Sequence, residues 1–140
     1  MSDLPEDAPL PTRGRLVLPI PPLTRSTCDE IANEVLAAHQ RGVQVRVITD
    51  DDQSVSQGSD IQKFRDAGIP VRDDNSPYHM HHKTCVIDGE LVINGSFNWS
   101  RQASIGNQEN VMIIRSKEIA KIFTAHFEKL WVQFAANQRN

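Results

Sequence analysis

Cysteine is scarce in this sequence of 140 residues, which contains only Cys28 and Cys85. Two cysteines with this spacing supply neither a disulfide framework nor the ligands of a zinc site, so we expect both to be small core residues. Long apolar runs are also missing, because no stretch approaches the roughly 18 residues of a membrane span. The first ten residues hold three acids and no base, unlike a signal peptide or an arginine-rich transit peptide. These absences predict a cytoplasmic protein, with peripheral membrane association left open.

Extremes of composition are absent as well. Hydrophobic residues make up 39% and charged residues 24% of the chain, which excludes a disordered chain or a fibrous repeat. We expect a flexible, proline-rich tail over residues 1–13 and a single domain over 14–137. The net charge is −3, but residues 71–140 hold eight bases against seven acids. The second half is therefore the better place for an anion, although an ordinary mixed surface explains the charge equally well.

Helical and strand-like segments alternate along the chain, with glycines after the first two helices. Helices are predicted at 28–40, 59–67 and 116–135. Strands are predicted at 15–20, 43–49, 69–72, 80–87, 91–93 and 111–114. This order predicts an α/β fold with a mixed central β-sheet flanked by helices.

Two of these elements carry more specific expectations. Prolines 19, 21 and 22 lack the backbone donor that a ladder needs, so segment 15–20 is predicted to be a brief strand or an edge element. The helix at 116–135 presents an apolar stripe that should pack across the sheet as core. The stripe consists of Ile119, Ile122, Phe123, Phe127, Leu130, Trp131 and Phe134.

Histidines gather at the start of the predicted strand 80–87. On a strand, His79, His81 and Lys83 share one face, while His82 points to the other. Such histidines suggest a metal site, to which the acidic residues 50–52 would add oxygen ligands. The Lys83 ammonium argues against a divalent cation and favours a phosphate anion. We therefore expect no metal and no cofactor, and read residues 50–52 as a solvated loop or cap.

Polar residues that suit phosphate binding follow downstream. The segment from Gly95 to Asn98 offers backbone N–H groups, the Ser96 hydroxyl and the Asn98 amide for phosphate oxygens, although Ser96 is equally explained as a helix cap. The full series reads His81-x-Lys83-x4-Asp88-x6-Gly95-Ser96-x-Asn98, followed by Asn107-x-Glu109. These residue types supply a nucleophile, a cation, neutral donors and an orienting acid for metal-free phosphodiester cleavage.

The series resembles the HxKxxxxD motif of the phospholipase D superfamily, with GSxN and NxE extensions similar to its small-nuclease and cardiolipin-hydrolase branch. The resemblance covers roughly residues 15–135 and implies a phospholipase D-like domain. It implies that His81 forms a phosphohistidine, that Glu109 orients the imidazole and that Asp88 buttresses the motif. It also implies that Lys83, Ser96 and Asn98 bind the phosphoryl oxygens. Asp88 has a second explanation, because Asp-Gly is itself a turn pair.

The resemblance implies a phosphodiesterase but leaves its substrate open. A phospholipid, such as cardiolipin or phosphatidylcholine, and a single-stranded nucleic acid contain the same bond. A nuclease should line a groove with basic and aromatic residues, whereas a lipase should show an apolar rim. In the family that this chain resembles, two motif copies meet across a two-fold axis. Because this chain has one copy, the resemblance implies a homodimer with the active site shared across its two-fold interface. The alternative is a catalytically degenerate domain that binds phosphate or a protein partner.

Overall fold

The computed structural model describes residues 14–19, 29–50, 60–99 and 101–137. The expected tail at 1–13, Cys28, Asp51 and Asp52 lie outside these residues. The helices are α1 (Asp29–Gln40), α3 (Asp60–Asp66), α4 (Arg101–Ile105) and α5 (Lys117–Gln133), followed by the 3-10 turn η1 (Ala135–Asn137). The strands are β1 (Arg15–Pro19), β2 (Gln44–Thr49), β3 (Val71–Asp73), β4 (Thr84–Ile87), β5 (Leu91–Gly95) and β6 (Val111–Arg115).

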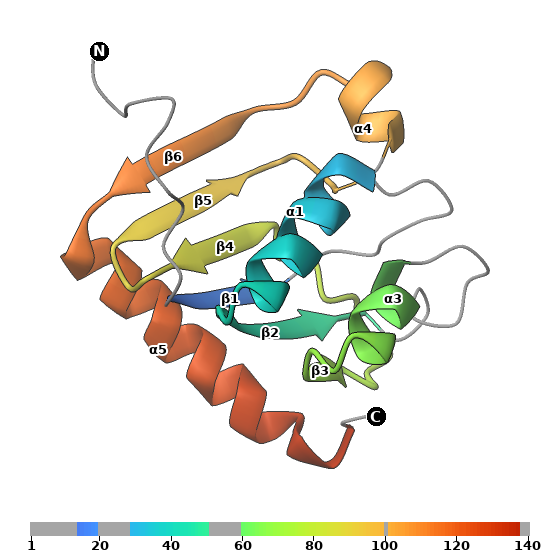
Figure 1. The fold of residues 1–140 in the computed structure, drawn as a ribbon. Helices are drawn as coiled ribbons and strands as arrows, with labels where there is room; N and C mark the ends of the chain where they lie inside the picture. Colours follow the sequence, from blue (N-terminus) through green and yellow to red (C-terminus); the bar gives the residue numbers. More distant parts are fainter. Residues whose placement is uncertain (1–13, 20–28, 51–59, 100, 138–140) are drawn as a thin grey trace.

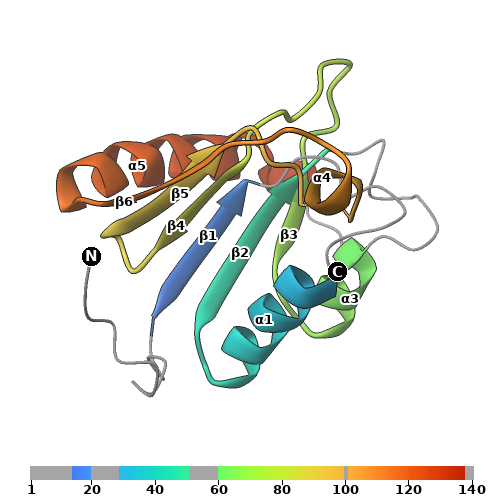
Figure 2. The same cartoon turned by 90° about the horizontal axis from the view of Figure 1, so that it is seen from above.

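The described strands form one mixed sheet in the order β3-β2-β1-β4-β5-β6. β1, β2 and β3 are parallel neighbours, whereas β4, β5 and β6 are joined by antiparallel pairing. Helix α5 lies on one face of the sheet, and α1 and α3 lie on the other (Figure 1; Figure 2). The predicted α/β fold with a mixed sheet flanked by helices is confirmed.

Strand β1 lies in the middle of the sheet, so the prediction of an edge element is wrong. It pairs in parallel with β2 and antiparallel with β4. Its side chains reach both faces of the sheet, since Leu16 and Val17 are 8% and 2% exposed and belong to different core clusters. Pro19 is the last residue of the strand, and the register of β1 with β4 covers only Leu16 and Val17, so the donor that proline lacks falls outside that ladder.

Two apolar clusters form the core, one on each face of the sheet. The α1–α3 core includes Ala32, Phe64 and the Cys85 side chain; the expectation that Cys85 is a core residue is confirmed, and burial raises the pKa of its thiol to about 12. The α5 core includes Phe127 and Trp131, whose rings stack at a centroid distance of 5.6 Å.

Helix α5 begins at Lys117, close to the predicted start at 116, and the Ser116 side chain caps it by accepting a hydrogen bond from the Ile119 backbone N–H. Its apolar stripe is buried as expected at Phe127, Trp131 and Phe134. The expectation fails for Ile122, which is 68% exposed. The apolar stripe is therefore wider than the surface that the sheet covers.

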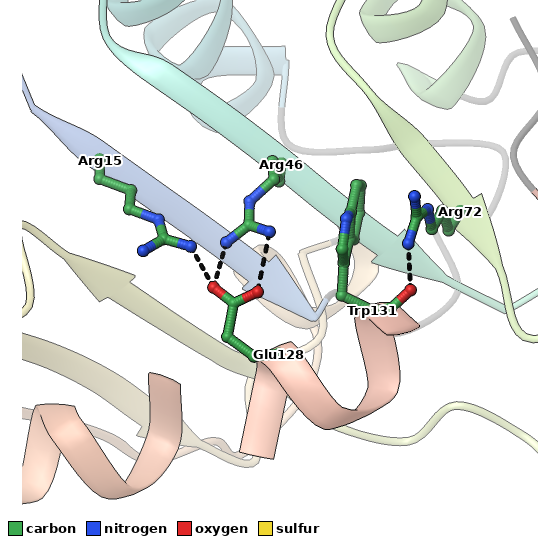
Figure 3. Close-up of polar contacts among 5 residues, drawn as sticks. All are labelled: Arg15, Arg46, Arg72, Glu128 and Trp131. Atoms are coloured by element: carbon green, nitrogen blue, oxygen red, sulfur yellow. Dashed lines mark hydrogen bonds and ion pairs between the residues drawn. The ribbon is translucent and has the colours of Figure 1, made fainter. Parts of the chain in front are cut away.

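Three arginines from neighbouring strands hold the C-terminal half of α5 against the sheet (Figure 3). Both Arg15 and Arg46 donate to the Glu128 carboxylate, with a distance of 3.0 Å from Arg46 Nη1 to Glu128 Oε2. Arg72 donates to the Trp131 carbonyl oxygen and lies 4.0 Å from the centroid of the Trp131 ring. Arg46 combines both kinds of contact, because its guanidinium pairs with the Glu128 carboxylate and lies 5.0 Å from the centroid of the Trp131 ring.

The predicted strand 80–87 begins only at Thr84. On one side β4 pairs with β1 only at Val86 and Ile87, and on the other its register with β5 starts at Thr84 opposite Asn94. Residues 79–83 form a loop instead of a strand, which we call the 79–83 loop. The strand alternation that was expected to put His79, His81 and Lys83 on one face therefore does not apply to them.

Candidate active site

The segments that carry the motif residues meet at one end of the antiparallel half of the sheet. Strand β4 starts at this end after the 79–83 loop, β5 ends there at Gly95, and β6 starts there at Val111. The register pairs Gly95 with Val111, so the turn after β5 and the loop before β6 are neighbours. The backbone thus brings the segments that carry His81, Lys83, Ser96 and Glu109 to the same edge of the sheet. In Figure 1 the start of β6 lies beside α4 at this edge.

The turn after β5 is joined to the loop before β6 by close backbone contacts. The Ser96 N–H donates to the Asn110 carbonyl oxygen at 3.0 Å, and the Asn110 N–H donates to Ser96 Oγ at 3.1 Å. A Cβ on Gly95 would lie 2.1 Å from the Asn110 carbonyl oxygen, so only glycine fits here. The glycine of the GSxN segment therefore fixes the distance between the two loops.

Glu109 is the hydrogen-bonding centre of these loops. Its carboxylate accepts from the Ser96 hydroxyl and, at 2.9 Å, from Asn107 Nδ2. These two hydrogen bonds, and then the charge of Lys83, hold the pKa of the Glu109 carboxyl below its usual value. The Asn107-x-Glu109 pair thus presents an ionised carboxylate at neutral pH, already bonded to the serine that was expected to bind phosphate.

Lys83 and His81 come from the 79–83 loop. Lys83 Nζ donates to the His81 carbonyl oxygen at 3.1 Å, which ties the two motif residues together. Partial burial lowers the pKa of the Lys83 ammonium, while the charge of Glu109 acts in the opposite direction. The His81 side chain is exposed and accessible to a substrate. Asn98 is partly exposed in the turn after β5.

Asp88 lies away from this group, at the other end of β4. The four residues of β4 span about 13 Å. Asp88 Oδ1 accepts from the Arg15 N–H at 2.8 Å, and the Asp88 N–H donates to the Arg15 carbonyl oxygen at 2.8 Å. A Cβ on Gly14 would lie 2.4 Å from Asp88 Oδ1. This geometry supports the turn explanation, in which Asp88 closes the hairpin and fixes the start of β1.

Asp50 contacts the 79–83 loop, and the sequence pattern did not reveal this role. Its side chain is only 1% exposed, so the expected solvated loop is wrong at this position. Asp50 Oδ2 lies 3.0 Å from His79 Nδ1 and accepts from the Met80 N–H at 3.1 Å. The described residues contain no group of three His, Cys, Asp or Glu side chains placed to hold a metal ion. The place of Asp50 directly after a buried strand was the available signal.

The His82 side chain contacts α5, although residue 82 lies in the 79–83 loop, where the strand alternation used to orient it does not hold. Its ring stacks on that of His126 at a centroid distance of 5.1 Å, above Thr84 and Phe123. Burial, and then the charges of His126, Lys83 and His81, lower the pKa of His82. His82 is therefore an exposed residue whose ring stacks on α5 and is mostly neutral at pH 7.

An apolar groove of about 430 Å³ runs between α1 and the sheet. Trp99 lines it, next in sequence to Asn98, and Cys85, Ile87 and Ile93 form its floor. Figure 1 shows no described helix over most of β5 and β6 on this face. An apolar surface thus begins next to the turn that carries Ser96 and Asn98.

Comparison with known proteins gives consistent results for sequence and fold. The family model described as "Cardiolipin synthase, PLD-like domain" matches residues 15–131. The mitochondrial cardiolipin hydrolase of Chlamydomonas reinhardtii is 52% identical over 108 residues, which cover 77% of this chain and 48% of the relative. The human protein of that name is 45% identical over 105 residues, which cover 75% of this chain and 42% of the human protein. The chain thus spans about half the length of these relatives.

Solved structures agree with this assignment. Nuc of Salmonella typhimurium, a phospholipase D family member, has a TM-score of 0.72 and 27% identity, covering 91% of this chain and 80% of Nuc. NucT of Helicobacter pylori has a TM-score of 0.68 at 20% identity, over 90% of this chain and 80% of NucT, which supports the fold. The resemblance noted in the sequence is confirmed.

The comparisons also correct one expectation. The relatives are named mitochondrial, so the expected cytoplasmic location is contradicted. Among the described residues, the helices are all too short or too polar to cross a bilayer.

Proposed function

This chain belongs to the phospholipase D-like domain family, and on that premise we propose that it hydrolyses a phosphodiester through a covalent intermediate on His81. The observation that carries the proposal is the meeting of three loops at one edge of the sheet. An exposed imidazole, an ammonium and an ionised carboxylate are supplied by His81, Lys83 and Glu109. Nucleophilic catalysis at phosphorus needs these groups within reach of one substrate.

The proposed reaction has two displacements. In the first, an imidazole nitrogen of His81 attacks phosphorus, a P–N bond forms, and the bond to the leaving oxygen breaks. The leaving oxygen takes a proton from a general acid. In the second, water attacks phosphorus, its proton passes to that same group, and the P–N bond breaks to free His81. Lys83 balances charge on the non-bridging oxygens, with Ser96 and Asn98 as further donors.

The general acid is proposed to come from a second copy of the chain. Each chain carries one HxKxxxxD motif, whereas the reaction needs one neutral imidazole to attack and one protonated group to donate. An isologous dimer would place His81 of each protomer against His81 of the other. Mixed dimers of wild type with His81→Ala should then be inactive, whereas a fully active monomer or a half-active mixed dimer would contradict sharing.

A phospholipid is the substrate class that we favour over a nucleic acid strand. The groove that begins at Trp99 has a largely apolar surface, which suits a lipid. Charged side chains also line it, namely Glu30, Glu34, Arg41 and Asp88. Arg72 is engaged with Trp131 under α5, so this cation is not presented to a nucleic acid strand. The names of the mitochondrial relatives point to cardiolipin and to a mitochondrial setting.

The test is a parallel assay on vesicles containing cardiolipin, vesicles of phosphatidylcholine, and labelled single-stranded DNA and RNA. We expect hydrolysis of the cardiolipin vesicles, abolished by His81→Ala and retained by His39→Ala, a histidine remote from the site on α1. Cleavage of nucleic acid alone would replace the lipid assignment. Phosphate or partner binding without turnover on any substrate would establish the degenerate domain instead.

A further inference from the structure

The 79–83 loop carries both motif residues of the proposed active site but has no strand ladder to fix it. Residues 79–83 precede β4 and lie outside the register that joins β4 to β1 and β5. Proximity and orientation supply a large part of an enzyme's rate enhancement, and a misplacement of about 1 Å costs on the order of 100-fold in rate. Other contacts must therefore hold His81 and Lys83 in place.

Asp50 supplies such contacts from the neighbouring parallel half of the sheet. It directly follows β2, and its carboxylate is 1% exposed. One oxygen, Oδ2, contacts two successive residues of the loop, His79 through Nδ1 at 3.0 Å and Met80 through its backbone N–H at 3.1 Å. The Met80 side chain is 7% exposed and packs in the α5 core.

We infer that Asp50 is a positioning residue for catalysis, which fixes the backbone immediately before His81 by binding His79 and Met80. The inference rests on the proposed function of His81 and Lys83, but it concerns a residue outside the motif. A buried carboxylate gives stronger hydrogen bonds than a neutral acceptor would. Asp50 therefore holds the upstream end of the loop, while the first pair of β4 with β5, at Thr84, holds its downstream end.

The kinetic test compares Asp50→Ala, Asp50→Asn and wild type on the cardiolipin vesicles. We expect Asp50→Ala to lower kcat by about 10- to 100-fold with KM changed less than threefold, because Asp50 touches the loop and not the substrate. Asp50→Asn should recover most of kcat, since its amide oxygen still accepts from the Met80 N–H. Asp60→Ala is the matched control, because Asp60 is a buried carboxylate, 2% exposed, on α3.

Hydrogen exchange at the Met80 backbone N–H provides a readout that does not depend on activity. We expect exchange at this amide to be much faster in Asp50→Ala than in wild type, and unchanged in Asp60→Ala. If wild type hydrolyses none of the substrates, the proposed function fails, and the exchange result alone decides the role of Asp50. Unchanged Met80 exchange, a kcat within twofold of wild type, or an equal loss of kcat in Asp60→Ala would overturn the inference.

Discussion

Replacement of Phe127 by alanine tests how far the fold depends on α5. Phe127 is 1% exposed at the centre of the α5 core. Its ring stacks on Trp131 with an interplanar angle of 19°, and the Arg46 guanidinium lies 5.0 Å from its centroid. Phe→Ala at a buried site costs about 3–5 kcal/mol through lost transfer energy and the cavity left behind. A domain of this size is stable by about 5–15 kcal/mol, so the variant should lose roughly a fifth or more of its stability.

Urea unfolding followed by tryptophan fluorescence measures this loss directly, because Trp131 contacts the deleted ring. With a slope of about 2 kcal/mol per molar urea, a loss of about 4 kcal/mol lowers the midpoint by about 2 M. Val132→Ala on the same helix is the control, since Val132 is 72% exposed and should change stability by less than about 0.5 kcal/mol. A Phe127→Ala loss below about 1 kcal/mol, or one equal to that of the control, would refute the assignment of α5 to the core.

Three further predictions concern reactivity, pH and metals. In a Cys28→Ala background, the native protein should react with a thiol reagent only upon unfolding, because burial raises the Cys85 pKa to about 12; fast reaction of folded protein would contradict this. The pKa of His82 is lower in the folded protein than in the unfolded chain, so below about pH 6.5 the unfolded chain binds more protons at this residue. The stability associated with neutral His82 is therefore present above about pH 6.5 and is lost as the pH falls toward the pKa of the folded protein. His126→Gln should raise the His82 pKa in an NMR titration, and an unchanged value would show that His126 does not contribute. EDTA should leave hydrolysis unchanged, whereas a loss restored by magnesium or zinc would favour a metal mechanism.

Local patterns predicted much of the fold because they depend on neighbouring residues. The apolar spacing from Ile119 to Phe134 predicted a helix over 116–135, and α5 spans Lys117–Gln133. The Asp88-Gly89 pair marked the β4–β5 turn, where both residues have positive φ. These signals are read within one turn of helix or one hairpin.

Expectations failed where distant segments decide the outcome. The prolines after β1 indicated an edge, but the burial of Leu16 and Val17 on opposite faces depends on β2 and β4. Asp50 appeared to belong to a solvated acidic loop because its partners His79 and Met80 lie 29 and 30 residues away.

The sequence predicted which residues make up the candidate site, but it did not predict the hydrogen bonds between them. The motif predicted that His81, Lys83, Ser96 and Glu109 lie close together. The register of β4, β5 and β6 brings the segments that carry them to one edge of the sheet. The hydrogen bond from Ser96 to Glu109 joins residues 13 apart in sequence, and it depends on that register. Asp88 is far from this edge because the whole of β4 lies between Asp88 and the 79–83 loop.

The central claim is that His81 is the nucleophile, and trapping the covalent intermediate tests it most directly. Wild-type protein is mixed with excess cardiolipin vesicles, quenched during the first turnover, digested and analysed by mass spectrometry. The account predicts a phosphoryl-linked adduct on the peptide that contains His81, located at that imidazole, with neither adduct nor turnover in His81→Ala. Turnover at the wild-type rate by His81→Ala, or an adduct on another side chain, would contradict it.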